Sequence, residues 1–279
     1  MRKRLCNTAG KTAKCTINAC LSEVLANRLA VPLSYLKQNE TMKKVLITGA
    51  NKSIGFETAK QLLDLGYYVY LGSRDLKKGE EAARQLQSAN VQAIQIDISN
   101  SQSIAEARKN IGELDVLINN AGISGGFPQS AITTGVAVMR EVFDTNYFGT
   151  IQVTQAFIDL LKKSPEPRIV NVTSGLASLT LHSDPAWKFY QVKSAAYGPS
   201  KTALNAYTVV LAYEFKDTAF KVNVVDPGYT ATDFNDHRGP RNVADAAKDI
   251  VKFATLGSDG PSGIFYSVDN NPETGVSPW

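Results

Sequence analysis

Short apolar runs alternate with longer stretches of helical spacing along most of the chain. The apolar runs have the length of strands and begin near residues 43, 67, 91, 115, 168, 221 and 263. Strands that alternate with helices are typical of a mainly parallel sheet, and continuous apolar runs suit strands that helices cover on both faces. The pattern therefore predicts a single α/β domain with a sheet of about seven strands.

This pattern starts at Met42, so the predicted domain spans residues 42–279. All three cysteines, Cys6, Cys15 and Cys20, precede it, together with seven Lys or Arg residues and only two acidic ones. The predicted domain itself holds 23 basic and 24 acidic residues, so the positive charge of the chain does not indicate a nucleic-acid partner. A domain without cysteine has no structural disulfides, which suits a reducing, cytoplasmic compartment.

Residues 1–41 allow three interpretations. They could be an organellar targeting segment, because they are basic and poor in acids, an authentic helical extension, or translation from an upstream start with Met42 as the true beginning. We favour the upstream start and expect the segment to be disordered or not native. Its apolar stretches are too short to span a membrane. The chain has no His/Cys cluster with metal-ligand spacing, so we expect no metal.

Tyr197 and Lys201 lie four residues apart in a stretch with helical spacing, AAYGPSKTALNAY. At this spacing two side chains project from the same face of a helix. A lysine ammonium beside a phenol favours the phenolate and lowers the pKa of the tyrosine, so Tyr197 could exchange a proton with an alcohol or ketone near neutral pH. The pair alone is a weak signal, because Tyr-x-x-x-Lys arises by chance in many helices.

Residues 43–55, KKVLITGANKSIG, join an apolar run to a glycine-punctuated turn and the start of a helical pattern. A strand, a glycine turn and a helix let the backbone approach a pyrophosphate closely, and the helix N-terminus offers free N–H groups. The segment favours a dinucleotide-binding loop, with an ordinary strand–helix turn as the alternative. With such a loop, the predicted sheet becomes a Rossmann-type, doubly wound one.

These segments resemble the short-chain dehydrogenase/reductase family, whose phosphate loop reads T-G-x-x-x-G-x-G. Thr48, Gly49 and Gly55 match this motif, and Ser53 stands where the middle glycine usually lies. Further family motifs follow in order: Asp97 after the third apolar run, Asn119-Asn120-Ala121-Gly122, Asn146, Ser174, Tyr197-x-x-x-Lys201 and Pro227-Gly228-x-x-x-Thr232. Each motif alone could be a turn or a helix cap. Together they are specific, because they fall at the carboxyl ends of successive predicted strands, where open parallel sheets bind ligands.

The resemblance implies hydride transfer between a nicotinamide and a carbonyl or alcohol group of a small-molecule substrate. Its implied catalytic residues are Ser174, Tyr197, Lys201 and Asn146. In these roles Tyr197 exchanges the proton, Ser174 holds the substrate oxygen and Asn146 supports a water chain to Lys201. The implied cofactor site comprises Thr48, Gly49, Asn51, Lys52, Ser53, Ile54, Gly55, Arg74, Asp97, Ile98, Asn119, Ala121, Gly122, Tyr197, Lys201, Pro227, Gly228, Thr230 and Thr232.

The residues after the second apolar run, YYVYLGSRD, bear on the choice of cofactor. An NAD-preferring site would place an acid there to bind the ribose 2′-hydroxyl. Ser73 occupies that position, Arg74 follows, and Lys52 lies in the phosphate loop. Two cations and no acid suit the 2′-phosphate of NADP, with solvated surface charges as the alternative. Asp75 comes next, and we expect it to cap the following helix.

Two loops should shape specificity. Residues 175–196 form a longer connection than a compact family member needs, and they include His182, Trp187, Phe189 and Tyr190. We expect this insertion to lie over the mouth of the site and to line it with aromatic side chains, with a surface loop as the alternative. The second loop, residues 233–240, is polar and could form a short lid.

Other functions remain open at this point. A 3-oxoacyl thioester reductase would need a basic surface for an acidic carrier, and none is evident. A reductase of carbon–carbon double bonds is disfavoured, because such family members usually space tyrosine and lysine further apart. A catalytically silent NADP-sensing protein would usually have lost Tyr197 or Lys201. The family often pairs through two long helices, here about 137–163 and 196–216, so a homo-oligomer is also open, although the insertion could block that face.

Overall fold

A computed structural model describes residues 42–279, which contain seven strands in one parallel sheet. The strands are β1 (Lys44–Ile47), β2 (Tyr68–Ser73), β3 (Val91–Gln95), β4 (Val116–Asn119), β5 (Arg168–Val172), β6 (Lys221–Asp226) and β7 (Phe265–Ser267). They are arranged in the order β3-β2-β1-β4-β5-β6-β7. The order reverses between β1 and β4, which is where doubly wound sheets bind ligands. The predicted Rossmann-type sheet is confirmed.

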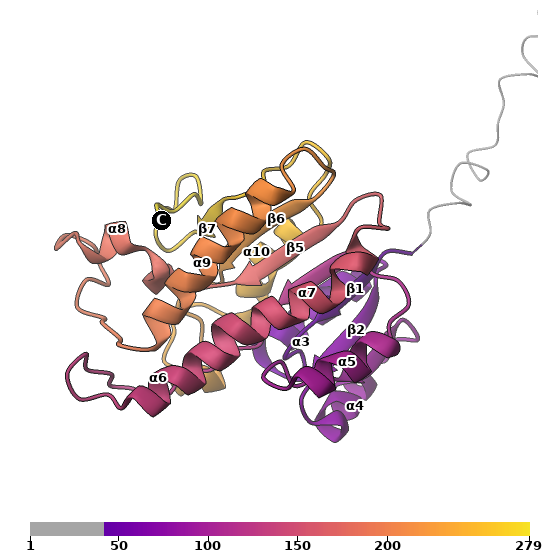
Figure 1. Cartoon of the computed structure of the whole chain (residues 1–279), viewed down its shortest axis with the longest axis horizontal. Coiled ribbons are helices and arrows are strands. Elements are labelled where there is room, and N and C mark those ends of the chain that lie inside the picture. The colour runs from indigo at the N-terminus through magenta and orange to yellow at the C-terminus, as the bar shows by residue number, and fades with distance from the viewer. Residues whose placement is uncertain (1–41) are drawn as a thin grey trace, which may run out of the picture. The chain divides into compact units, whose positions relative to one another are not determined.

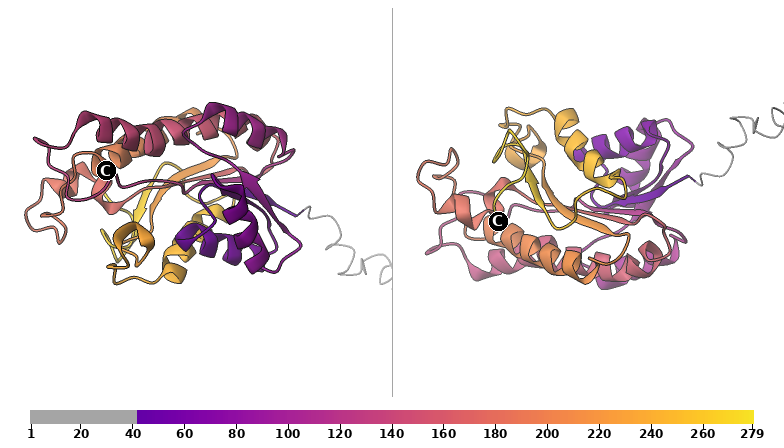
Figure 2. Two further views of the ribbon diagram at one scale, coloured as in Figure 1. Left: turned by 90° about the horizontal axis from the view of Figure 1, so that it is seen from below. Right: turned by 90° about the horizontal axis from the view of Figure 1, so that it is seen from above.

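Helices cover both faces of this sheet and form a three-layer sandwich (Figure 2). One face carries α3 (Ser53–Asp64), α4 (Leu76–Gln85) and α10 (Val243–Ala254), and the other carries α5 (Ser101–Lys109), α7 (Thr150–Leu161) and α9 (Tyr197–Glu214). A further helix, α6 (Val136–Phe143), is continuous with α7 through a π-helical turn, η1 (Asp144–Gly149). The short α8 (Leu179–His182) lies at the end of the molecule where β5 leads into the predicted insertion (Figure 1).

The core follows from the apolar strands. Val45, Leu46 and Ile47 of β1 are completely buried. Because side chains alternate across a strand, Val45 and Ile47 pack on the side of α3 and α10, whereas Leu46 packs on the side of α5, α7 and α9. Each such side chain stabilises the fold by about 1.5–3 kcal/mol relative to exposure. The three positions of β1 that are covered on both faces are therefore all apolar, as the sequence indicates.

The register of the sheet brings distant motifs together. Ile47 of β1 pairs with Ile118 of β4, and Val172 of β5 pairs with Val225 of β6. All strands are parallel, so the residues that follow them emerge at one edge of the sheet. The sequence motifs that follow the strands are thereby gathered at that edge.

In the part of the chain that the structure describes, no helix is both long enough and apolar enough to cross a membrane. The predictions for residues 1–41 concern a segment outside the described residues.

Candidate active site

The turn between β1 and α3 is shaped for close approach of a ligand. Gly49 has a φ of +64°, which glycine adopts without strain. A Cβ on Gly55 would stand 2.6 Å from both Asn120 Nδ2 and Gly49 O, so only glycine fits there. No side chain caps α3, and its first turn holds no acidic residue. The free N–H groups of its first turn therefore fit the pyrophosphate of a dinucleotide.

Ser53, which replaces the usual glycine of the loop, takes a left-handed conformation with a φ of +52°. The position thus keeps the backbone geometry that favours glycine although it carries a side chain. A residue with a Cβ costs about 1–2 kcal/mol in this conformation. The departure from the family motif therefore adds local backbone strain at this position.

Asn120 ties the loop after β4 to the phosphate loop. Its Nδ2 donates hydrogen bonds to Thr48 O at 2.9 Å and to Gly49 O at 3.1 Å. In return, Thr48 Oγ1 accepts from the backbone N–H groups of Asn120 at 3.0 Å and Ala121 at 3.1 Å. Side chain and backbone of the predicted Asn-Asn-Ala-Gly motif thus fix the start of the cofactor loop.

Gly122 lies beside two other predicted site residues, Asn146 and Lys201. A Cβ at Gly122 would stand 3.1 Å from Asn146 Oδ1 and 3.4 Å from Lys201 Nζ. Asn146 is fully buried in η1, where its side chain accepts from Ile123 N at 2.8 Å and donates to Ile123 O at 2.9 Å. Wider π-helical turns inside helices often occur at functional sites. Here the turn interrupts the long helix predicted over about 137–163.

The Ser174 side chain lies near the Tyr197 hydroxyl, close enough to lower its pKa. Tyr197 is the first residue of α9, and Ser174 follows β5, so two different elements bring these residues to the carboxyl edge of the sheet. Lys201, one helical turn further along α9, is 4% exposed and donates from Nζ to Val172 O at 2.8 Å. The structure thus brings Ser174, Tyr197, Lys201 and Asn146 to one edge of the sheet.

The ionisation of these groups differs from the sequence-based expectation. Burial raises the pKa of Tyr197 above its ordinary value, the charge of Asp226 raises it further, and the Ser174 hydrogen bond lowers it. Burial also lowers the pKa of Lys201 to about 8. The predicted lowering of the tyrosine pKa by Lys201 is therefore wrong for this arrangement, because desolvation opposes both charged forms.

Gln129, which the sequence analysis did not single out, holds the N-terminus of α9. It is 7% exposed, and its Oε1 accepts from the backbone N–H groups of Ala196 at 3.0 Å and Tyr197 at 3.1 Å. Its Nε2 donates to Ser124 O at 2.6 Å and to Gly126 O at 2.8 Å. The residue before α9, Ala196, cannot cap the helix with its own side chain, so Gln129 replaces the missing cap.

Two aromatic rings pack directly against Tyr197. The Phe234 ring centre lies 5.3 Å from that of Tyr197, and the Phe127 ring centre lies 6.2 Å from it. The predicted aromatic insertion packs mainly on itself, since Trp187 contacts His182 at 5.0 Å and Phe189 at 5.5 Å between ring centres. The rings that border the tyrosine therefore come from the loops after β4 and β6.

Several predicted cofactor residues also have structural roles. Asp97 Oδ1 accepts from Ser99 N at 2.9 Å and so closes a turn. Asn119 Nδ2 donates inside the core, to Asn171 Oδ1 at 2.8 Å. Thr230 Oγ1 donates to Pro227 O at 2.9 Å. Elsewhere, Ile98 is buried, Ile54 is partly buried, Asn51 is half-buried, Gly228 has a φ of +73°, and Thr232 caps the short helix η3 (Asp233–Asn235).

The cations near the predicted 2′-phosphate position have different surroundings. Lys52 Nζ lies 2.7 Å from Asp233 Oδ2, and both side chains are exposed by half or more. Arg74 is exposed at the end of β2. Asp75 caps α4 and accepts a hydrogen bond from Lys78 N at 3.3 Å, as predicted. No acidic side chain other than this cap follows β2 directly.

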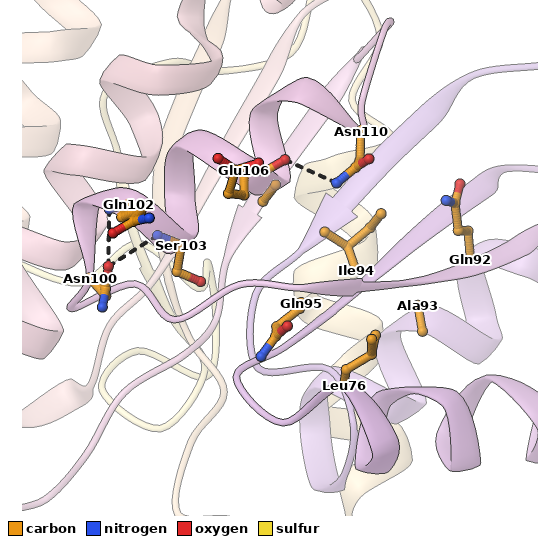
Figure 3. A pocket seen from close by; sticks show the side chains of 11 residues that line it. Leu76, Gln92, Ala93, Ile94, Gln95, Asn100, Gln102, Ser103, Glu106 and Asn110 are labelled. Atoms are coloured by element: carbon orange, nitrogen blue, oxygen red, sulfur yellow. Dashed lines mark hydrogen bonds between the residues drawn. The ribbon is translucent and has the colours of Figure 1, made fainter.

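A separate cavity of about 520 Å³ lies between β3 and α5 (Figure 3). Polar side chains line most of it, among them Gln92, Gln95, Gln102 and Glu106. None of the predicted catalytic residues lines it. In residues 42–279, no three His, Cys, Asp or Glu side chains cluster as metal ligands would.

Comparison with known proteins agrees with this geometry. A sequence model of the family described as short chain dehydrogenase matches residues 43–242. The (−)-isopiperitenone reductase of Mentha piperita is 33% identical over 82% of this chain and 98% of its own length. The (+)-neomenthol dehydrogenase of Capsicum annuum is 31% identical over 82% and 97%. The structure of salutaridine reductase from Papaver somniferum superimposes with a TM-score of 0.68, at 30% identity, over 80% of this chain and 99% of that one.

Proposed function

The chain belongs to the short-chain dehydrogenase/reductase family of oxidoreductases, and we propose that it reduces an aldehyde or ketone to an alcohol, or catalyses the reverse reaction, with NADPH as its cofactor. One observation carries this proposal. Tyr197 and Ser174 stand at the same sheet edge that holds Lys201 and the phosphate loop, and Ser174 lies close enough to Tyr197 to lower the pKa of its hydroxyl. A proton donor, an oxygen-binding hydroxyl and a dinucleotide site are what carbonyl reduction requires.

When bound, the reduced nicotinamide supplies the hydride that the carbonyl carbon accepts. Tyr197 donates its hydroxyl proton to the carbonyl oxygen, so the product leaves as a neutral alcohol. Ser174 donates a hydrogen bond to the same oxygen and stabilises the negative charge that develops there. Lys201, as an ammonium, stabilises the tyrosinate that remains. Alcohol oxidation uses the same groups in the opposite direction.

The proposed NADP preference rests on the cations beside the ribose position. Arg74 follows β2, and the last residue of the strand, Ser73, is not acidic. The guanidinium of Arg74 can bind a phosphate through two hydrogen bonds. Lys52 is a second candidate, but its ammonium already pairs with Asp233. We therefore assign the larger share of 2′-phosphate recognition to Arg74.

We propose an apolar carbonyl compound as the substrate. Phe127 and Phe234 flank the ring of Tyr197 and are 51% and 42% exposed, so a substrate that reaches the hydroxyl would contact both rings. The relatives are named for neomenthol, isopiperitenone and salutaridine, which makes menthone and isopiperitenone suitable first test compounds. Contact with these faces also favours substrates that can stack on aromatic rings.

The test is NADPH oxidation by the purified protein against a panel of aldehydes, ketones, quinones, enones and acyl thioesters. We expect an alcohol product with at least one apolar carbonyl compound, and Tyr197→Phe should abolish turnover while NADPH binding, followed by fluorescence, persists. Turnover with acyl thioesters alone would point to a 3-oxoacyl reductase. NADPH binding without any turnover would point to a cofactor sensor and overturn the proposal.

We also propose a cytoplasmic location, because residues 42–279 contain no cysteine that a disulfide could use. Mass spectrometry of the N-terminus of the native protein, with fractionation of the cell, would test this location and the status of residues 1–41. Whether the protein forms homo-oligomers is a question for light scattering of the same preparation.

A further inference from the structure

An ion pair between Lys52 and Asp233 joins two segments that are both predicted to bind the cofactor. Lys52 Nζ lies 2.7 Å from Asp233 Oδ2, although the two residues are 181 positions apart in the sequence. Lys52 belongs to the phosphate loop between β1 and α3. Asp233 directly follows Thr232, the last predicted cofactor residue in the loop after β6. The mechanism above assigns no role to Asp233.

The segment that Asp233 begins also reaches the proposed proton donor. Asp233 is the first residue of η3, and its Oδ1 lies 3.0 Å from Nε2 of His237. The next residue, Phe234, packs on Tyr197 with 5.3 Å between the ring centres. The residue that is tied to the phosphate loop therefore adjoins the ring that borders Tyr197.

The base of this segment, residues 233–240, is closed without help from the phosphate loop. Ala231 N donates to Arg241 O at 2.9 Å, and Arg241 N donates to Tyr229 O at 3.2 Å. The guanidinium of Arg241 is anchored on Asp249 at 2.6 Å. These contacts hold both ends of the segment in place, so the segment can move as a lid on a fixed base.

Only one polar contact holds the lid, residues 233–240, to the rest of the described structure. Its other hydrogen bonds and ion pairs stay within the loop after β6, such as the bond from Asn235 Nδ2 to Thr230 O at 2.8 Å and the pair of Arg238 with Asp236. Among residues 42–279, the pair with Lys52 alone connects the lid to another segment.

This pair can be exchanged for another anion. The Lys52 and Asp233 side chains are 63% and 50% exposed, and exposed ion pairs are weak because water screens them. The hydrogen bond with Lys52 lowers the pKa of Asp233, so its carboxylate is charged at neutral pH. A phosphate carries more negative charge than a carboxylate and offers more acceptor oxygens to an ammonium. A phosphate that reaches Lys52 therefore displaces the carboxylate.

We propose that Asp233 is a latch that competes with NADPH for Lys52, so that a phosphate of the cofactor releases the lid from the phosphate loop. In the free enzyme the latch keeps Phe234 beside Tyr197. Once Lys52 binds the phosphate, the lid can move and admit a carbonyl compound to Tyr197. The inference rests on the cofactor proposed above and adds an order of binding, with the cofactor first and the substrate second.

The competition makes a quantitative statement about affinity. Coupling between two binding events is reciprocal, so a change that removes the latch must strengthen NADPH binding by the same factor that the latch costs. For an exposed ion pair this factor is about 2–5-fold in Kd. The factor should approach one at high salt, because salt screens exposed charges.

The first test is titration of the cofactor-free protein with NADPH, followed by the fluorescence of the bound cofactor at low salt. We expect Asp233→Asn to lower the Kd for NADPH by about 2–5-fold. The same substitution in a Lys52→Met background should leave the Kd of that background unchanged, because no ammonium remains to compete for. An equal gain in both backgrounds would overturn the latch.

Asp236→Asn is the matched control, because it removes the same charge from the same loop. The Asp236 side chain is 80% exposed and pairs with Arg238 instead of Lys52. This variant should bind NADPH with the Kd of the wild type. If it gains as much affinity as Asp233→Asn, the net charge of the loop accounts for the effect, and the latch is overturned.

Hydrogen–deuterium exchange of the lid amides, residues 233–239, tests the release itself without any turnover. In the wild type, NADPH should speed exchange of these amides. Cofactor-free Asp233→Asn and Lys52→Met should already exchange as fast as the NADPH-bound wild type, since both lack the ion pair. Slower exchange in the wild type with NADPH would overturn the release of the lid.

The outcomes separate this inference from the proposed function. A wild-type protein that does not bind NADPH contradicts the proposed cofactor. A wild type that binds NADPH with the same Kd as Asp233→Asn overturns the latch and leaves the proposed function intact. If Asp233→Asn does not fold, lid exchange in cofactor-free Lys52→Met decides, and an exchange rate equal to that of the free wild type overturns the inference.

Discussion

Replacing Gln129 by methionine should disable the enzyme without touching any group that contacts substrate. The methionine side chain is similar in length to glutamine, but it can neither accept nor donate the hydrogen bonds that the glutamine amide makes. The change removes hydrogen bonds to the backbone of Ala196, Tyr197, Ser124 and Gly126. Ala196 is completely buried, so its N–H group cannot turn to water.

The magnitude follows from these four bonds. A buried N–H group without a partner costs about 1–3 kcal/mol, and each bond that water can replace contributes about 0.5–1.5 kcal/mol. We therefore expect Gln129→Met to lower the free energy of unfolding by about 3–7 kcal/mol. Tyr197 is held through its own backbone N–H, so its hydroxyl should shift relative to Ser174. A displacement of about 1 Å can reduce turnover by about 100-fold.

The assay combines urea unfolding with steady-state kinetics. We expect kcat for carbonyl reduction to fall by about 10–100-fold, while the KM for NADPH changes little because the phosphate loop is untouched. Gln129→Glu keeps an oxygen for the two N–H groups and should retain more activity than the methionine variant. Gln85→Met, at an exposed position of α4, is the control. Wild-type stability and kcat in Gln129→Met would refute the capping role.

Three further predictions concern the cofactor loop and the buried lysine. Arg74→Glu should reverse the preference for NADPH over NADH in kcat/KM, and an unchanged preference would show that Arg74 does not bind the 2′-phosphate. Ser53→Gly should raise the free energy of unfolding by up to about 1 kcal/mol in urea titrations, because glycine relieves the left-handed strain; a loss of stability would contradict this. Lys201→Met should abolish turnover yet stabilise the protein at pH 7 by about 1–3 kcal/mol, since burial lowers the pKa of Lys201 from 10.5 to about 8. Between these pH values the folded wild type binds fewer protons than the unfolded chain, so its free energy of unfolding should rise relative to that of Lys201→Met as the pH rises from 8 to 10.5. A constant difference in the free energy of unfolding between Lys201→Met and the wild type over that range would contradict the pKa shift.

The sequence by itself determined the order of the elements and the chemistry that they carry. Continuous apolar runs define strands such as Val45 to Ile47, because positions covered on both faces of a sheet are mostly apolar. The residues that follow parallel strands lie at one edge of the sheet, so the sequence alone assigns the motifs at Gly49, Gly122, Ser174 and Gly228 to one site. Local chemistry also sufficed for Asp75, which caps the helix that it precedes.

Only the tertiary structure decided the contacts between distant segments. Gln129 lies 68 positions before Tyr197, and no periodicity marks a lone polar residue as the cap of another element. The rings of Phe127 and Phe234 meet Tyr197 for the same reason, and Lys52 finds its partner Asp233 181 positions away. Spacing along a helix indicates which side chains share a face, but the direction of a pKa shift depends on burial and on every nearby charge. That is why the pKa of Tyr197 is raised by burial and by the charge of Asp226, where the spacing to Lys201 alone predicted a lowered one.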